Sequence, residues 1–505
     1  MLSQTDIKQI KNKGISIHEL NKQLEYLNKG MHYLSIITPA STKRGIKCIP
    51  ITEQKIYLNA WFSYLKDNKI IIKFVPASGS PYKMFKNLFE FLLANHTIPT
   101  TNFEQIFFQK IHHFAFYQDL NEICVTNEKK SIDELIAARN YKIIIKNLLF
   151  DQGLNYGYLP KGLMLFHTNP NGHRTAMEEH LVEGAFYAIN KNREVKIHFT
   201  VLPEYRYSAE SFIKKKIDIY TKLFNVKYCV NFSNQDICTN TLALDKNNCP
   251  IHNQNGLVFS LGGHGSLIRN LNSITADIIF IKNIDNVVPD SIKATTIRYK
   301  QLLAGILVTY QQKIFEYLSL IDSGKYTHEK LLEMLYFLQN DLYIKNPETK
   351  YLENGELILY IKSKLNRPIR ICGMVRSKGM KSGKPFFTVN PDKTISLQIL
   401  EISQIDLKNS EGKNMIKNST HSNPVDLVCS VKNYKGEKFD LLKYTDVNTA
   451  FISSEEINGE KFKTFKLPGL WNGAMSNWNT IFVEVPIETF NPVETINDLL
   501  RPKHQ

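Results

Sequence analysis

The stretch IIIKFVPASGSPYKMFKNLFEF, residues 70–91, holds the first residues whose types and spacing could support chemistry. An apolar run typical of a buried strand leads into Pro76 and a turn of small residues, and an apolar run with helical spacing follows. Bare N–H groups in such a loop, together with the positive end of the next helix, bind phosphate. We expect the phosphate-binding residues to be Ala77, Ser78, Gly79 and Ser80, with Lys83 neutralising charge. The alternative is an ordinary strand–turn–helix link in which Gly79 serves only the backbone angle.

Two further loops carry polar residues that could bind a ligand. Lys161 follows Pro160 in the turn YLPKG, where it is either a partner for an anionic group or a solvated turn lysine. The turn LGGHG contains Gly262 and Gly263, which allow a backbone to approach a flat ligand closely. His264 in the same turn is equally compatible with a bond to the ligand or to the backbone.

A carboxylate and an amide, Asp285 and Asn286, end an apolar segment in KNIDNVV. A carboxylate that faces phosphates from the end of a strand is placed to hold Mg²⁺, and the neighbouring amide to bond hydroxyl groups. The competing interpretation is an Asx turn, which Asp and Asn commonly form at the ends of strands.

The elements that must position these loops alternate along the chain. Apolar segments at 69–75, 194–202, 226–232 and 276–284 predict strands, and stretches such as TAMEEHLVEGAFYAINK between them predict helices. This alternation predicts an α/β fold with a mixed, mainly parallel, doubly wound sheet covered on both faces. Ligands of such sheets lie beyond the carboxyl ends of the strands, so the polar loops are expected to converge on one edge.

Four segments are expected along the chain. Residues 1–65 read as a helical N-terminal segment, residues 66–297 as an α/β core, residues 298–365 as a helical insertion and residues 366–505 as a β-rich part.

Composition limits the function classes. The 505-residue chain is 43% hydrophobic, which is typical of a folded globular protein, and its formal net charge is +15. Most of this charge is lysine scattered along predicted helices, so we expect no nucleic-acid partner. No secretory signal or membrane span is expected, and seven cysteines without a CxxC pair favour a cytoplasmic protein.

Seven motifs in one order resemble the UDP-sugar pyrophosphorylases, the nucleotidyltransferases that include the UDP-glucose and UDP-N-acetylglucosamine enzymes. The motifs are VPASGSPYKMF, LPKG, NFSNQD, GGHGSLIRNL, NIDNVV, LQILEISQID and IFVEVPIETFNPVETINDLL, between about residues 70 and 500. The whole chain is more similar to an uncharacterised bacterial domain-of-unknown-function family related to those enzymes.

The resemblance implies a nucleotide-diphospho-sugar transferase-like fold and an enzyme that joins a nucleoside monophosphate from a nucleoside triphosphate, UTP favoured, to a sugar 1-phosphate with release of pyrophosphate. It also implies that the core at 66–297 binds a nucleotide and that the last part, 366–505, binds the sugar and completes the catalytic fold. It implies catalytic roles for Lys83, Lys161 and Asp285, and Mg²⁺ as the cofactor. Gln235 and the turn at 262–265 would read the base, and Asn286 and Glu401 would bond sugar hydroxyls. The expected partners are the triphosphate and the sugar phosphate, with the protein a monomer or small homo-oligomer.

Two positions depart from the pattern of those enzymes. Lys83 stands where they carry an arginine, which keeps the charge but loses the bidentate fork. Glu494 stands where a lysine is expected, and it would help to hold a second Mg²⁺, weaken the phosphate site, or point to solvent. The alternative function is therefore a sugar-nucleotide-binding protein whose catalysis is weakened.

Overall fold

The computed structural model describes residues 3–29, 33–79, 81–170, 172–376, 382–457 and 460–505. Its chain divides into two compact units, each built from separate stretches of sequence. The first unit comprises residues up to 71 together with 235–281 and 301–487, and the second comprises residues 72–234, 282–300 and 488–505.

The second unit contains the strands that the sequence predicted at 69–75, 194–202 and 226–232. Its strands are β3 (Ile71–Pro76), β4 (Leu165–Asn169), β5 (Gly172–Thr175), β6 (Glu194–Val201) and β7 (Lys227–Asn234). Its helices are α4 (Tyr82–Leu93), α5 (Asn102–Gln109), α6 (Tyr117–Glu128), α7 (Ile132–Ala137), α8 (Tyr141–Leu149), α9 (Ala176–Tyr187) and α10 (Arg206–Phe224).

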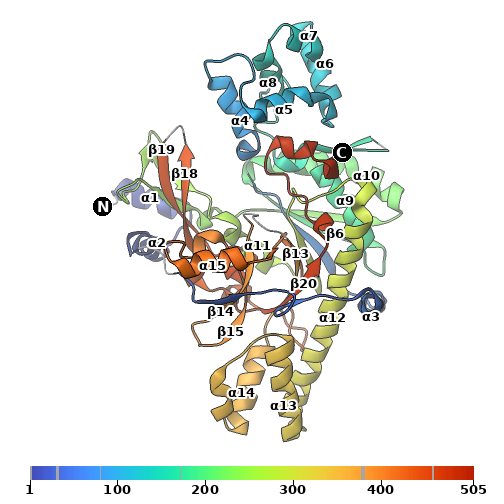
Figure 1. Ribbon diagram of the computed structural model, residues 1–505, viewed down its shortest axis with the longest axis vertical. Coiled ribbons are helices and arrows are strands. Elements are labelled where there is room, and N and C mark those ends of the chain that lie inside the picture. Colours follow the sequence, from blue (N-terminus) through green and yellow to red (C-terminus); the bar gives the residue numbers. More distant parts are fainter. Residues whose placement is uncertain (1–2, 30–32, 80, 171, 377–381, 458–459) are drawn as a thin grey trace. The chain divides into compact units, whose positions relative to one another are not determined.

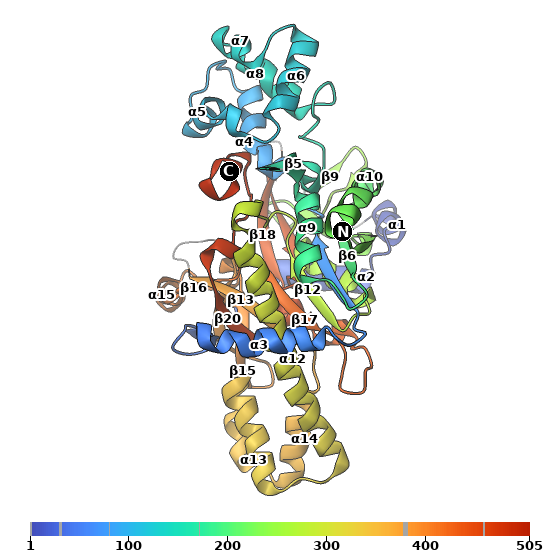
Figure 2. The same cartoon turned by 90° about the vertical axis from the view of Figure 1, so that its right-hand side faces the viewer.

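Strands β3, β6 and β7 are parallel, as their near-continuous apolar sequences predict. Helix α9 lies against β6, and Gly184 allows this approach because a Cβ there would lie 2.9 Å from Val195 (Figure 2). Helices α4 to α8 form a separate group within the same unit (Figure 1). One apolar core joins these elements, and Ile284 and Val493 from distant stretches of sequence belong to it.

The first unit is richer in strands. They are β1 (Ile36–Pro39), β2 (Ile46–Lys47), β8 (Thr241–Leu244), β9 (His252–Asn253), β10 (Gly256–Leu257), β11 (Phe259–Ser260), β12 (Ile278–Lys282), β13 (Ile369–Arg376), β14 (Lys384–Val389), β15 (Ile395–Leu400), β16 (His421–Ser422), β17 (Asp426–Ser430), β18 (Phe451–Ile457), β19 (Glu460–Lys466) and β20 (Asn479–Val485). Lys282, the last residue of β12, belongs to the second unit.

Within this unit the strand order β2-β20-β13-β17-β12 forms its part of the central sheet. Strands β2, β20 and β13 are parallel, whereas β17 runs antiparallel to β13. The predicted fold class, α/β with a mixed and mainly parallel central sheet, is confirmed. The first unit also contains two smaller antiparallel sheets, β1-β14-β15 and β11-β8-β19-β18.

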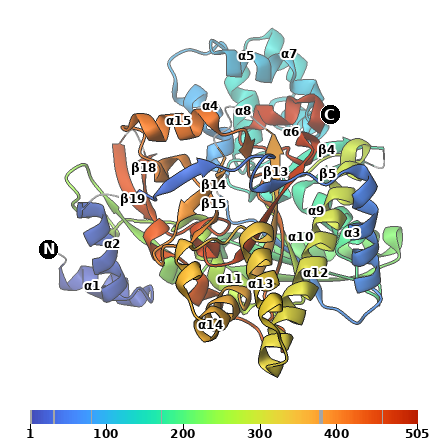
Figure 3. The same ribbon diagram turned by 60° about the horizontal axis from the view of Figure 1, so that its bottom comes forward.

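The helices of the first unit are α1 (Gln4–Asn12), α2 (Ile17–Lys29), α3 (Ile51–Tyr64), α11 (Leu267–Ser273), α12 (Lys293–Ser323, from residue 301 onward), α13 (His328–Tyr336), α14 (Asn354–Leu365) and α15 (Ser410–Asn418). Helices α1 and α2 lie side by side and bury Ile10 and Leu20 with Leu242 and Phe465 (Figure 3). Helices α12 to α14 account for the helical stretch expected at residues 298–365. In the described ranges, no helix combines the length and the apolarity that crossing a membrane requires.

Candidate functional site

The loop between β3 and α4 is open at its glycine. Ala77 is buried and its N–H donates to the carbonyl of Thr200 at 2.9 Å, whereas Gly79 is exposed. The φ of Gly79 lies outside the left-handed region, and a Cβ there would meet no described atom within 4 Å. The φ of Gly79 and the described atoms around it therefore leave room for a side chain at this position. Ser80 lies outside the described residues.

Lys83 lies in the first turn of α4, and its side chain is exposed. The residue at the N-terminal cap, Pro81, makes no side-chain hydrogen bond to the helix. The first turn of α4 therefore has a cation beside it and no side-chain cap from Pro81, which suits an anion.

Lys161 is held by two oxygens rather than by solvent. It begins a 3₁₀ turn, Lys161–Leu163, and its Nζ donates to Oδ2 of Asp285 at 3.0 Å and to the carbonyl of Val493 at 2.7 Å. Only 13% of its side chain is exposed. The interpretation of Lys161 as a solvated turn lysine is therefore wrong.

Asp285 lies between two residues of the core. Ile284 and Val287 are buried, and the side chain of Asp285 is 21% exposed. Asn286 donates its N–H to the carbonyl of Asn283 at 3.2 Å, which closes a tight turn after β12. The core thus presents one carboxylate at a fixed place.

Asn286 has a structural role in this turn. It is 1% exposed, and its Oδ1 accepts the N–H of Asn491 at 2.8 Å. Residues 488–505 are thereby tied to the same turn as Asp285, and the same stretch supplies Val493 to Lys161. Sequence spacing did not identify Val493 because its carbonyl, not its side chain, makes the contact.

The two carboxylates expected to hold Mg²⁺ differ in setting. Glu494 is exposed, and its N–H donates to Oδ2 of Asp498 at 2.8 Å, while Asp285 accepts from Lys161. Among the described residues, no three His, Cys, Asp or Glu side chains form a group that could hold a metal. The donors present do not form a resident metal site, although Mg²⁺ often binds through one carboxylate plus substrate phosphates.

The glycines of the turn at 262–265 are explained by packing. A Cβ on Gly262 would lie 2.3 Å from the carbonyl oxygen of Thr239, and Gly263 has a φ of +78°. The carbonyl of Gly262 accepts the N–H of Leu467 at 3.0 Å. These glycines let the turn approach its own chain closely, so they do not by themselves indicate a ligand.

His264 and Glu401 meet at one aromatic side chain, Trp471. The rings of His264 and Trp471 have centroids 4.4 Å apart. Burial raises the pKa of the Glu401 carboxyl, and a hydrogen bond with the Trp471 side chain opposes this rise. Sequence reasoning missed Trp471, which lies 70 positions from Glu401 and in no motif with it.

Gln235 is also buried, and within the described part of the chain its Nε2 has no hydrogen-bond partner.

The predicted site residues therefore fall into two groups. Lys83, Lys161, Asp285, Asn286, Glu494 and the loop at 77–79 belong to the second unit, whereas Gln235, Gly262, Gly263, His264 and Glu401 belong to the first. In the second unit the N–H of Ile284 donates to the carbonyl of Pro76 at 3.1 Å, which links the two strand ends that carry Asp285 and the loop.

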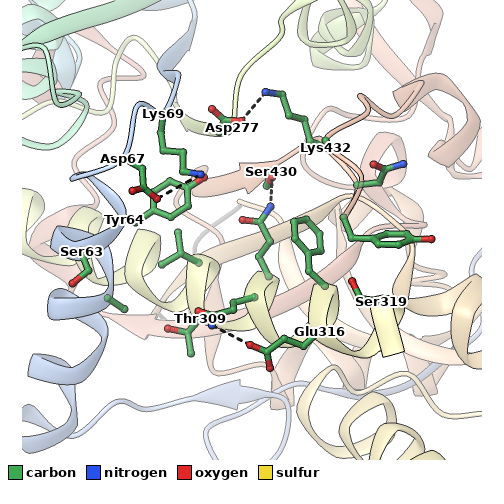
Figure 4. A pocket seen from close by; sticks show the side chains of 18 of the residues that line it. Ser63, Tyr64, Asp67, Lys69, Asp277, Thr309, Glu316, Ser319, Ser430 and Lys432 are labelled. Atoms are coloured by element: carbon green, nitrogen blue, oxygen red, sulfur yellow. Dashed lines mark hydrogen bonds and ion pairs between the residues drawn. The ribbon is translucent and has the colours of Figure 1, made fainter. Parts of the chain in front are cut away.

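A cavity of about 1020 Å³ within the first unit contains none of the predicted site residues. It lies between α3, α12 and the end of β17 (Figure 4). Among its charged side chains, Lys69 pairs with Asp67 and Lys432 with Asp277, whereas Glu316 accepts from the neutral side chain of Gln312. Lys432 donates to Asp277 at 2.6 Å, and Gln311 donates to Ser430 at 2.6 Å. These contacts give Lys432, Asp277, Gln311 and Ser430 partners within the protein.

Comparison with known proteins gives a family and a set of distant structural neighbours. The model of a family described as Domain of unknown function (DUF4301) matches residues 3–505. The search of curated proteins found no match.

The solved structures similar to this chain include UDP-sugar pyrophosphorylases. The uridine diphosphate N-acetylglucosamine pyrophosphorylase of Trypanosoma brucei, in complex with an inhibitor, aligns with a TM-score of 0.47 and 10% identity over 95% of this chain and 74% of that one. The UDP-glucose pyrophosphorylase of Leishmania major aligns with a TM-score of 0.44 and 10% identity over 99% and 79%. The UDP-glucose phosphorylase of Trypanosoma brucei aligns with a TM-score of 0.44 and 11% identity over 98% and 76%.

Proposed function

The chain belongs to the DUF4301 family, and for this member we propose a nucleotidyltransferase activity that joins a nucleoside monophosphate from a triphosphate, UTP favoured, to a sugar 1-phosphate. The observation that carries the proposal is the fixed ion pair of Lys161 and Asp285, on a turn hydrogen-bonded to the end of the strand that leads into the loop at 77–83. The order of the sequence motifs supports the same chemistry.

The reaction would form one P–O bond and break another. An oxygen of the sugar 1-phosphate attacks the α-phosphorus of the triphosphate, and the bond from that phosphorus to the bridging oxygen breaks as pyrophosphate leaves. Such transfer depends on positioning and charge neutralisation more than on covalent chemistry. Mg²⁺ would arrive with the triphosphate and neutralise part of its charge.

The predicted phosphate-site residues of the second unit have roles that follow from their positions and contacts. The backbone at 77–79 and the exposed Lys83 would hold the β- and γ-phosphates. Lys161, held in place by Asp285 and the Val493 carbonyl, would stabilise charge on the α-phosphate. Asp285 would in turn be available to the Mg²⁺ of the substrate.

In the first unit, the base would be bound by Gln235, Gly262, Gly263 and His264. Glu401 would accept a hydrogen bond from a sugar hydroxyl. The unpartnered Nε2 of the buried Gln235 is the feature of this group that a base carbonyl would satisfy. A contact of Asn286, in the second unit, with the sugar remains a prediction, and its Oδ1 already accepts from Asn491.

A sugar-nucleotide-binding protein with weakened turnover is the second candidate, because Glu494 places an exposed carboxylate next in sequence to Val493. Like charge there would oppose phosphate. Binding without pyrophosphate release would identify this alternative.

The test is pyrophosphate release from UTP and Mg²⁺ with glucose 1-phosphate or N-acetylglucosamine 1-phosphate, alongside nucleotide-induced shifts in melting temperature. We expect Lys161→Ala to lower turnover about 10²- to 10³-fold, the scale for losing one fixed charge donor. Lys86→Ala is the matched control, because Lys86 is exposed and pairs only loosely with Glu90 at 3.6 Å. Near-full activity of Lys161→Ala would remove Lys161 from the site.

A further inference from the structure

A fully buried cluster of charges lies in the second unit on the residues that lead into the candidate site. Glu183, on α9, accepts from Nζ of Lys73 through Oε2 at 2.9 Å and from Nζ of Lys282 through Oε1 at 2.8 Å. All three side chains are 0% exposed. The hydroxyl of Tyr187 also donates to Oε2 of Glu183, at 3.0 Å.

The two lysines occupy informative positions. Lys73 lies on β3, which ends at Pro76 just before the loop at 77–83, and Lys282 is the last residue of β12, three positions before Asp285. The carboxylate of Glu183 thus bonds to a lysine on each of the two strands that lead to the predicted phosphate and metal ligands.

His180 connects the cluster directly to the turn of Asp285. Its carbonyl accepts from Nζ of Lys73 at 3.1 Å, and its Nε2 donates to the carbonyl of Ile284 at 3.2 Å. Within the described residues its buried Nδ1 has no hydrogen-bond partner, which agrees with a neutral ring protonated on Nε2. Burial, followed by the charge of Lys73, holds the pKa of His180 well below its usual range.

Burying the charges of this cluster costs desolvation free energy that an apolar core would not cost. Burial alone would raise the pKa of Glu183, but Lys282 and Lys73 hold it well below its usual range, and burial lowers the pKa of Lys73 to about 7. Apolar side chains of similar volume often stabilise a core as well as or better than a buried ion triad. Apolar residues cannot provide the directional hydrogen bonds that link the strand of Lys73 to the strand of Lys282.

We propose that Glu183 is a positioning residue, which, through Lys73, Lys282 and His180, fixes the start of the loop at 77–79 and the turn of Asp285 relative to each other. This inference rests on the proposed nucleotidyltransferase function for its effect on rate. Its structural part, the order of the two segments, does not depend on that function.

The test uses Glu183→Gln, which keeps the shape of the side chain and removes its charge. Glu178→Gln is the matched control on the same helix, because Glu178 is 2% exposed but pairs with Lys216 and Tyr220 instead of the strand ends. Two readouts are taken: kcat and KM for the nucleotide, and hydrogen exchange at the N–H groups of Ile284 and Ala77.

We expect Glu183→Gln to lower kcat about 10²-fold, the scale of a misplacement of about 1 Å, while the nucleotide KM changes less than about threefold. Exchange at Ile284 and Ala77 should become faster than in the wild type and in Glu178→Gln. Wild-type kcat together with wild-type exchange at these two amides would overturn the proposal.

Failure of the proposed function is recognised separately. If the wild-type protein releases no pyrophosphate, the exchange measurement alone decides, and unchanged exchange overturns the positioning role. If Glu183→Gln does not fold, the triple variant Lys73→Met, Glu183→Leu and Lys282→Met replaces it. A folded triple variant with wild-type kcat or, without turnover, wild-type exchange would show that the cluster only fills the core.

Discussion

At the scale of single residues, the informative feature is that charged groups of the second unit are held by partners distant in sequence. Lys161 is bonded to Asp285, 124 positions away, and to Val493, 332 positions away. A lysine fixed by two oxygens loses little further freedom when it meets an anion, which is the condition for preorganised stabilisation of charge.

Asp285→Asn tests the carboxylate of this pair. A neutral amide is a poor ligand for Mg²⁺, so the Mg²⁺ dependence of nucleotide binding should be weakened or lost. The measurement is a Mg²⁺ titration of the nucleotide-induced shift in melting temperature. Glu494→Gln in the same titration reports separately on the second carboxylate, and an unchanged midpoint in Asp285→Asn would exclude Asp285 as a ligand.

The lowered pKa of the buried His504 predicts that the stability of the protein depends on pH. Its Nδ1 lies 2.8 Å from Nε2 of His167, and burial first, then the charge of His167, lowers the pKa of His504 to about 3. The unfolded chain, with a histidine pKa of about 6.5, therefore binds the proton first on acidification. Stability should fall as pH drops from about 6.5 toward 3, by at most about 1.4 kcal/mol per pH unit from this group.

The check is urea unfolding at pH 7.5, 6 and 5 for the wild type and His504→Leu. The variant should lose less of its unfolding free energy between pH 6 and pH 5, because it lacks this proton uptake. Parallel pH profiles for the two proteins would contradict the assignment.

At the scale of elements, the two glycine-bearing loops serve different purposes. The loop after β3 has open space at Gly79, whereas the turn at 262–265 is pressed against Thr239 and Leu467. Both loops carry glycine, so only their surroundings show which glycine is held by packing.

The pair Gly79→Ala and Gly262→Ala turns this difference into a measurement. Gly79→Ala should leave stability unchanged or raise it by about 0.4–1 kcal/mol, since its backbone angle suits alanine, while nucleotide affinity falls. Gly262→Ala should lower stability by about 1–3 kcal/mol, because its Cβ would overlap the Thr239 carbonyl oxygen. Urea unfolding and nucleotide titration of both variants decide, and full nucleotide affinity in Gly79→Ala would contradict a ligand role for the loop.

At the scale of the whole molecule, the net charge of +15 is the property that most favours a different function, namely nucleic-acid binding. Many of the charges are engaged, including the buried pairs of Lys73 and Lys282 with Glu183 and of Lys293 with Glu179. An ion pair carries no net charge, so such pairing leaves the excess of +15 in place. What argues against nucleic acid is that most of this positive charge is lysine scattered along the chain.

We therefore expect no specific nucleic-acid complex. Fluorescence anisotropy of labelled duplex DNA and single-stranded RNA should show weak binding at low salt that disappears near 150 mM, as counterion release dictates. Nucleotide-induced stabilisation should persist at that salt concentration. Tight, salt-resistant binding of either nucleic acid would contradict this expectation.

The sequence by itself determined the elements and the class of fold. The strands expected at 194–202 and 226–232 are β6 and β7, and the helical stretch at 298–365 contains α13 and α14, because hydrophobic periodicity is a local property that a chain carries in its own order of residues. The same local reasoning identified the loop at 76–83 and the carboxylate at the end of β12.

Only the tertiary structure decided which of these residues meet. Glu183 finds Lys73 and Lys282 at separations of 110 and 99 positions, and Trp471 joins His264 and Glu401. It also showed that packing requires glycine at position 262, whereas the described atoms around Gly79 leave room for a side chain. The reason is physical: propensity and periodicity act over a few residues, whereas ion pairing, burial and close approach depend on distances that exist only after the chain has folded.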